Sequence, residues 1–102
     1  MKLTDITPFI GAELTGVTYA DLERQEVLGA FADAVARRQL VVIRGIEMTP
    51  RQQVALAVRL GRPVPFVVEN YRHSEVPEIL VSSNERKNDQ PIGVARVGNF
   101  WH

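Results

Sequence analysis

The first half of the chain alternates short apolar runs with one long amphipathic segment, and this order constrains the fold more than any other feature. Apolar residues occupy every second position from Ile10 to Leu14, which predicts a half-buried strand that ends at Gly16. Residues 21–38 carry apolar side chains at helical spacing and end in two arginines, which predicts an amphipathic helix. Residues 40–43 are apolar throughout and mostly β-branched, so we expect a second strand, buried on both faces.

A second helix over residues 49–61 is the clearest single element. Thr49 and Gln52 fit a Thr-x-x-Gln capping box, and Pro50 suits the first helical position. Apolar residues follow at helical spacing, and Gly61 is the residue type expected just after a helix ends. The sequence signals for the start, the apolar face and the end of this helix therefore agree with one another.

Proline interrupts the second half of the chain, where the patterns are weaker. Residues 62–77 are expected to be mostly loop, residues 78–82 a further strand, and the polar residues 84–91 a loop. The strand–helix–strand order of the first half is compatible with a small βαβ sheet. Such a sheet would need a phosphate-binding loop to carry nucleotide chemistry, and neither Gly-x-Gly-x-x-Gly nor the Walker pattern occurs.

Composition excludes several classes of protein. The chain has 102 residues, enough for one small domain, and its 12 basic residues are balanced by 12 acidic ones. A formal charge of zero disfavours binding to nucleic-acid phosphates. The chain has no cysteine, which excludes a disulfide scaffold and a thiolate zinc site. With no signal sequence and no apolar run long enough to span a bilayer, we expect a cytoplasmic protein without nucleic-acid or membrane partners.

The chain has two histidines, and each has a plain and a functional interpretation. His73 lies in a polar cluster that is either a solvated surface loop or the lip of a substrate site. His102 is either a solvated chain end or a metal ligand beside the apolar wall that Trp101 would provide. A mononuclear non-haem iron site needs two histidines and a carboxylate, and the spacing of these two histidines neither suggests nor forbids a shared metal.

Several short segments, taken in order, resemble a known family. They are residues 9–17, 39–45, 49–53, 60–61, 78–84, 91–93 and 101–102. This series is similar to the N-terminal third of the taurine dioxygenase (TauD/TfdA) family of iron(II)- and 2-oxoglutarate-dependent oxygenases. The resemblance covers essentially the whole chain, although no single motif in it is decisive.

The resemblance implies an α+β chain that forms the N-terminal portion of a double-stranded β-helix (jelly roll), with two helices packed on short strands. Residues 1–102 would be one incomplete domain that ends inside the His-x-Asp metal motif. The implied reaction hydroxylates a C–H bond of a small organic substrate while 2-oxoglutarate is decarboxylated to succinate, with Fe(II) as the cofactor. We expect the chain alone to be inactive, because one histidine cannot hold catalytic iron(II) against water.

The resemblance also implies roles for individual residues. His102 matches the first histidine of the metal motif. Tyr71 matches a tyrosine that lies near the substrate in the taurine enzyme, whereas Val68 stands where that enzyme has a histidine, so the implied substrate is not taurine. Asn84 and Asn99 are expected to contact the substrate at the pocket mouth. No catalytic side chain and no 2-oxoglutarate-binding residue is expected in this chain.

Two other interpretations stay open at this point. The chain could be a non-catalytic truncated module that folds alone or pairs with another chain, or a small α/β interaction domain whose family likeness is accidental. A cooperative unfolding transition of a monomer would identify an independent domain. The sequence also leaves homo-oligomer formation open.

Overall fold

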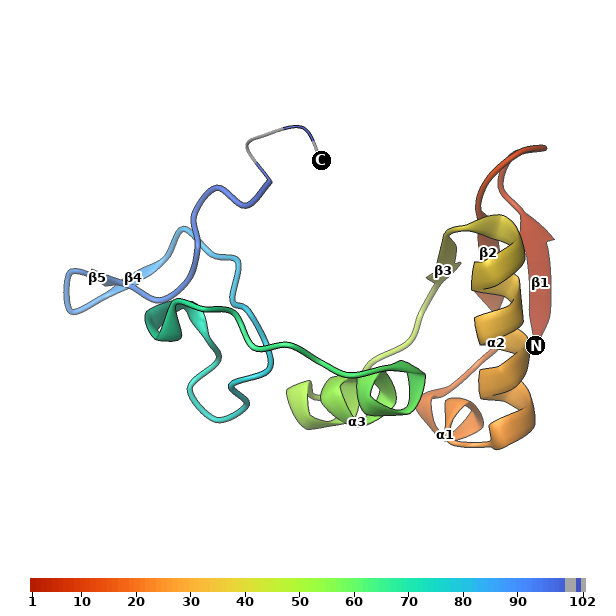
Figure 1. Ribbon diagram of the computed structural model, residues 1–102, viewed down its shortest axis with the longest axis horizontal. Helices are drawn as coiled ribbons and strands as arrows, with labels where there is room; N and C mark the ends of the chain where they lie inside the picture. The colour runs from red at the N-terminus through yellow and green to blue at the C-terminus, as the bar shows by residue number, and fades with distance from the viewer. Residues whose placement is uncertain (99–100, 102) are drawn as a thin grey trace. The chain divides into compact units, whose positions relative to one another are not determined.

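The computed structural model describes residues 1–98 and 101, and the chain divides into two compact units, Met1–Thr49 and Pro50–His102 (Figure 1). The first unit contains β1 (Lys2–Asp5), β2 (Ala12–Thr15), α1 (Tyr19–Leu22), α2 (Gln25–Arg38) and β3 (Val41–Ile43). The second unit contains α3 (Pro50–Leu60), the 3-10 helix η1 (Glu69–Tyr71), β4 (Arg86–Lys87) and β5 (Gln90–Pro91). The α+β class is confirmed, while the described strands do not by themselves make up a jelly roll. In the described part of the chain, every helix is too short or too polar to cross a membrane.

The first unit is built on a three-stranded sheet in which β2 is central. β1 runs antiparallel to β2, with Lys2 opposite Thr15, and β3 runs parallel to β2, with Val41 opposite Ala12. A parallel pair requires a crossover connection, and α1 and α2 provide it. The expected strand around residues 10–16 is therefore confirmed as β2, whereas β1 was not expected because all four of its residues are exposed.

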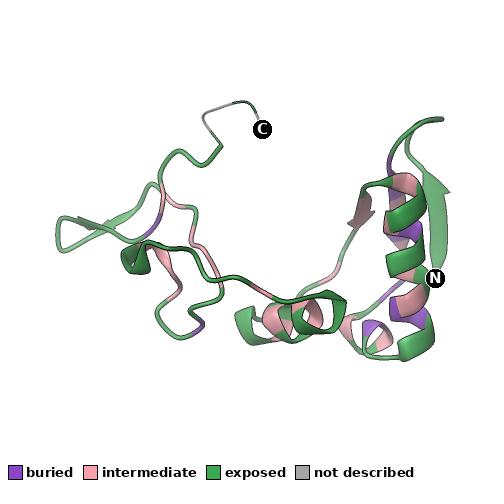
Figure 2. Ribbon diagram, in the orientation of Figure 1, coloured by how far each residue is buried: buried purple, intermediate pink, exposed green. Residues whose placement is uncertain are grey.

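The core of the first unit lies between this sheet and α2 (Figure 2). Its buried apolar side chains come from β2, from α1, from α2 and from the segment that follows β2. They are Ala12, Leu14, Val17, Leu22, Val27, Leu28 and Ala34. Leu22 is completely buried and is the largest side chain of the described residues to be so. An apolar cavity of about 100 Å³, bordered by Leu3 and Phe31, lies at the edge of this core.

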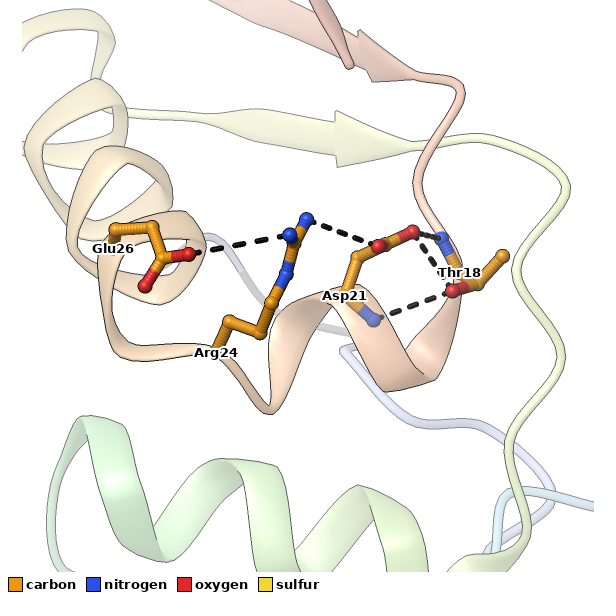
Figure 3. A network of polar contacts seen from close by, with 4 residues as sticks. All are labelled: Thr18, Asp21, Arg24 and Glu26. Atoms are coloured by element: carbon orange, nitrogen blue, oxygen red, sulfur yellow. Dashed lines mark hydrogen bonds and ion pairs between the residues drawn. The ribbon is translucent and has the colours of Figure 1, made fainter.

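The expected helix over residues 21–38 is wrong at its start, because the helical segment is broken at Arg24 (Figure 3). The backbone of Arg24 is extended, with φ −76° and ψ 132°, and separates α1 from α2. Thr18 caps α1: its hydroxyl accepts a hydrogen bond from the Asp21 backbone at 3.2 Å, and the Asp21 carboxylate accepts one from the Thr18 backbone at 2.9 Å. Arg24 then pairs with Asp21 at 3.1 Å and approaches Glu26 at 4.0 Å.

β3 is not buried on both faces, which corrects the expectation for residues 40–43. It lies at an edge of the sheet, so among the described strands only β2 pairs with it, and its three residues are half-buried. Leu40 lies outside the strand with 53% of its surface exposed. An apolar run signals a strand, but its burial depends on neighbours that the run itself does not specify.

The segment before β2 is held by Arg38, the last residue of α2. One terminal nitrogen of its guanidinium donates to the backbone carbonyl of Thr7, and the backbone carbonyl of Arg38 accepts from Gly11 at 2.9 Å. Its Nε lies 3.2 Å from a carboxylate oxygen of Asp5 but donates no hydrogen bond to any described residue. The Arg38–Asp5 contact is thus an ion pair without hydrogen-bond geometry, and the backbone bonds fix the segment.

The second unit begins with the helix that the sequence predicted most clearly. α3 spans Pro50–Leu60, and the Gly61 amide donates to the Ala57 carbonyl at 2.9 Å, which confirms both ends. The expected strand over residues 78–82 is wrong. Its backbone forms only isolated bridges, Arg72 with Leu80 and Ser82 with Val94, because its two pairing partners come from different parts of the chain.

The expected loop over residues 84–91 is also wrong, because it contains a hairpin formed by β4 and β5. Arg86 lies opposite Pro91 and Lys87 opposite Gln90. The two turn residues, Asn88 and Asp89, have φ of 52° and 62°. Two successive positive φ values are typical of the tight turns that match strand twist, and asparagine and aspartate tolerate this conformation better than most residues.

Candidate functional site

Tyr71 ends the short helix η1 and is held there by the backbone on both sides. Its amide donates to the Val68 carbonyl at 3.2 Å, and its carbonyl accepts from the Val81 amide at 2.8 Å. Its ring is half-buried and lies against Phe66, with ring centroids 6.4 Å apart and a tilt of 36° between the planes. The backbone of Tyr71 is therefore held on both sides, and its ring lies beside Phe66 while part of the residue stays exposed.

A surface depression of about 340 Å³ adjoins Tyr71. Val68 and Asn70 from η1 and its approach form one part of its wall, and Gln90 and Pro91 from β5 form another. Residues that are far apart along the chain thus meet at this place. Val68 offers an apolar contact next to the phenol, which suits a ligand with hydrocarbon character.

A second depression of about 470 Å³ shares two wall residues, Asn70 and Pro91, with the first. Its remaining wall is partly basic, partly polar and partly apolar. It consists of Arg72, His73, Ser74, Val81, Lys87 and Ile92. These two depressions, which share wall residues, are the candidate site in the second unit, and both have the volume of small-molecule pockets.

Arg72 lies in the wall of the second depression and is held by contacts with two neighbouring segments. Its Nε donates to the carbonyl of Phe66 at 2.6 Å, and a terminal nitrogen lies 3.9 Å from the carboxylate of Glu69. Because Glu69 is largely exposed, water screens this ion pair and its contribution is small. The hydrogen bond to Phe66 is the stronger constraint, and it ties the segment before η1 to the segment after it.

His73 is half-buried and has a definite structural role. Its Nδ1 accepts backbone hydrogen bonds from Glu75 at 3.1 Å and Val76 at 3.2 Å, and its own amide donates to the Ile79 carbonyl at 2.8 Å. An imidazole nitrogen that accepts two N–H groups carries no proton, so in the neutral ring the proton is on Nε2. His73 therefore organises this surface loop and also lines the second depression, and the choice between a solvated loop and the lip of a substrate site stays open.

The predicted substrate contacts differ in their position relative to the two depressions. Tyr71 borders the first depression, as a substrate contact would. Asn84 is exposed and is not one of the residues that line the two depressions. Asn99 and His102 lie outside the described residues. The roles of all four residues stay predictions.

The described residues do not form a complete metal site by themselves. Across residues 1–98 and 101, no three histidine, aspartate or glutamate side chains form a group that could hold a metal ion. His73, the one described histidine, uses Nδ1 for the loop. What the described residues can do is bind and orient a small molecule beside Tyr71, and no catalytic step is assigned to them.

Sequence reasoning missed several residues that line the site. Asn70, Lys87, Gln90 and Pro91 all border one or both depressions. The hairpin brings the last three into place, and its signal was the Asn88-Asp89 pair, whose residue types favour a tight turn. No signal in the sequence indicated Asn70.

Comparison with known families places the chain in one of them. A family model described as "Taurine catabolism dioxygenase TauD, TfdA family" matches residues 2–102. The matched range takes in both compact units, and therefore also the two depressions of the second unit.

Proposed function

The chain belongs to the TauD/TfdA family of dioxygenases, and on that premise we propose that it is part of an iron(II)- and 2-oxoglutarate-dependent oxygenase. The proposed reaction hydroxylates a C–H bond of a small organic substrate and decarboxylates 2-oxoglutarate to succinate. The single observation that carries this proposal is the family match over residues 2–102. The jelly roll, the iron and the co-substrate follow from the family and belong to the proposal.

In this proposal the chain contributes one metal ligand and part of the substrate site. His102 is the iron ligand, and Tyr71, Asn84 and Asn99 contact the substrate. Iron with 2-oxoglutarate, when bound, supplies the oxidant for the C–H bond. The other ligands and the residues that hold 2-oxoglutarate are proposed to lie beyond residues 1–102, in a longer gene product.

In this proposal the described residues orient the substrate. The Tyr71 ring is fixed against Phe66, and its backbone is bonded on both sides, so it can present a rigid surface to a substrate. Val68 lies at the edge of the same depression and favours a hydrocarbon group at that point. Rigid placement of the reacting C–H bond is the contribution a protein makes to chemistry that a cofactor carries out.

The first experiment determines the coding sequence around codon 102. The proposal predicts an aspartate codon two positions after His102, in the same reading frame. A stop codon or another residue there would contradict the assignment of His102 to a His-x-Asp motif. In that case a non-catalytic module would be the better interpretation.

The second experiment measures succinate produced from 2-oxoglutarate by the longer gene product with Fe(II). His102→Ala should reduce succinate formation at least about 100-fold, because losing a metal ligand removes the metal site. Glu47→Gln is a control in the first unit, since Glu47 is exposed and lines neither of the two depressions. Equal activity of both variants would contradict the metal role of His102. For the 102-residue chain alone, calorimetric titration with Fe(II) under argon should give no tight 1:1 site.

A further inference from the structure

We propose that His73 is a pH-sensitive switch for the loop of residues 74–78. The neutral imidazole keeps this loop in the closed conformation that the structure shows, and protonation of the ring opens it. The inference concerns a conformational change of the 102-residue chain itself. It requires neither a metal nor a ligand, and it does not rest on the proposed function.

The switch consists of two hydrogen bonds to a single nitrogen atom. Nδ1 of His73 accepts from the backbone amide of Glu75 at 3.1 Å and from that of Val76 at 3.2 Å. A ring nitrogen can accept only while it carries no proton, and both nitrogens of the imidazolium ion are donors. Protonation of Nδ1 therefore removes both hydrogen bonds at once and turns the new N–H group toward two other donors. The closed loop is compatible only with the neutral ring.

The two hydrogen bonds keep Val76 in its buried position. This residue is 5% exposed, and it has the one buried apolar side chain among the described residues of the second unit. The backbone holds the other end of the loop. The Ile79 amide donates to the Val76 carbonyl at 3.0 Å, and the His73 amide donates to the Ile79 carbonyl at 2.8 Å. Loss of the two side-chain hydrogen bonds therefore frees the start of the loop first, and Val76 with it.

No charged side chain of the described residues compensates for a proton on the ring. None of the ion pairs among these residues includes His73. Arg72 and Lys87, which line the same depression as the ring, are both cationic. The carboxylates of the neighbouring segments belong to Glu69 in η1, which lies 3.9 Å from Arg72, and to Glu75 and Glu78 in the loop. A protonated ring would therefore lose two hydrogen bonds and gain no ion pair.

The direction of the pH dependence follows from these contacts. The two hydrogen bonds stabilise the closed loop while the imidazole is neutral, and this stability is lost as the pH falls through the range in which imidazole takes up a proton. For unperturbed side chains that range is centred at about pH 6.5 for histidine and at about pH 4.3 for glutamate. Opening of the loop between about pH 7.5 and about pH 5.5 would therefore come from the histidine rather than from Glu75 or Glu78.

The experiment follows the backbone amides of the full chain by NMR between about pH 7.5 and about pH 5.5. Protection of the Glu75 and Val76 amides against hydrogen exchange, corrected for the intrinsic exchange rate at each pH, should fall about tenfold over this range. The chemical shifts of these amides should follow the same titration curve as the ring protons of His73. The Ala12 amide, which donates to the Leu40 carbonyl at 2.9 Å in the first unit, should keep its protection and serves as the internal control.

Two variants separate the acceptor role of His73 from its charge. In His73→Asn the side-chain oxygen lies at the same distance along the side chain as Nδ1, accepts backbone N–H groups and does not titrate. The loop should therefore stay closed over the whole pH range. In His73→Gln the amide group lies one carbon farther from the backbone, so the loop should be open already at about pH 7.5.

Either of two results would overturn the inference. One is unchanged protection of the Glu75 and Val76 amides while the ring protons of His73 titrate. The other is the same loss of protection in His73→Asn as in the unmodified chain, because that variant has no imidazole to protonate. The Gly61 amide, which donates to the Ala57 carbonyl in the second unit, reports whether each variant is folded there. If His73→Gln has lost that protection, the unmodified chain and His73→Asn alone decide the outcome.

Discussion

Replacing Leu22 by alanine should remove most of the stability of the first unit. Leu22 has no exposed surface and connects α1 to the core of that unit. Removing a fully buried leucine side chain costs about 2–5 kcal/mol, which combines the lost transfer free energy with the cavity left behind. A unit of this size, Met1–Thr49, is expected to have a free energy of unfolding of about 2–7 kcal/mol. The substitution therefore removes most of the available stability.

Leu40→Ala is the matched control, because Leu40 belongs to the same unit but keeps 53% of its surface exposed. The substitution loses only about half of the transfer free energy of a buried leucine side chain and leaves no enclosed cavity. The expected loss in the free energy of unfolding is therefore about 1 kcal/mol. The backbone hydrogen bond from the Ala12 amide to the Leu40 carbonyl, at 2.9 Å, does not involve the side chain and should survive.

The assay is urea unfolding followed by NMR, which reports the amide resonances of the first unit separately from those of the second. With a denaturant slope of about 1 kcal/mol per molar urea for a unit this small, a 2 kcal/mol difference separates the two midpoints by about 2 M. Equal midpoints for Leu22→Ala and Leu40→Ala would refute the reasoning. So would a Leu22→Ala variant that unfolds at the same urea concentration as the unmodified chain.

Three further predictions concern single contacts. Thr18→Ala should lower the free energy of unfolding of the first unit by about 1 kcal/mol, whereas Thr18→Ser should not, in the same urea assay. The Thr18 backbone amide, which donates to the Asp21 carboxylate, holds the pKa of Asp21 below its ordinary value. The stability from this contact is therefore complete above about pH 4 and is lost as the pH falls through the lowered pKa. Asp21→Asn should abolish this part of the acid dependence of the urea midpoint. Gly93→Ala should destabilise the second unit by about 1–3 kcal/mol in thermal unfolding, because a Cβ there would lie 2.6 Å from the Val81 carbonyl oxygen. An unchanged thermal midpoint would contradict this prediction.

Local signals explain which elements could be predicted from the sequence. α3 has a proline at its first position, Pro50, and a glycine just after its end, Gly61, so nothing beyond the segment itself is needed to place it. The break at Arg24 was missed because the apolar spacing continues across it. The deciding feature is the capping box between Thr18 and Asp21, which uses aspartate where glutamate or glutamine is the usual signature.

Long-range pairing explains what could not be predicted. The burial of β3 depends on its position at the edge of the sheet, and the isolated bridge of Ser82 depends on where Val94 lies. The positions of the residues in the candidate site also depend on long-range pairing. Tyr71 could be predicted through the family resemblance. Lys87 lies at the second depression because of the pairing of β4 with β5, which no periodic pattern in the sequence indicates.

The β4–β5 hairpin offers a practical attachment point for reporters of ligand binding. Its strands supply Lys87 to one depression and Gln90 to the other, while the turn residues Asn88 and Asp89 line neither. A fluorophore introduced at position 88 would sit within two residues of both walls without occupying them. Exposed turns of this kind also tolerate inserted residues, so the tip can change in length while the pairing of Arg86 with Pro91 keeps both walls in register.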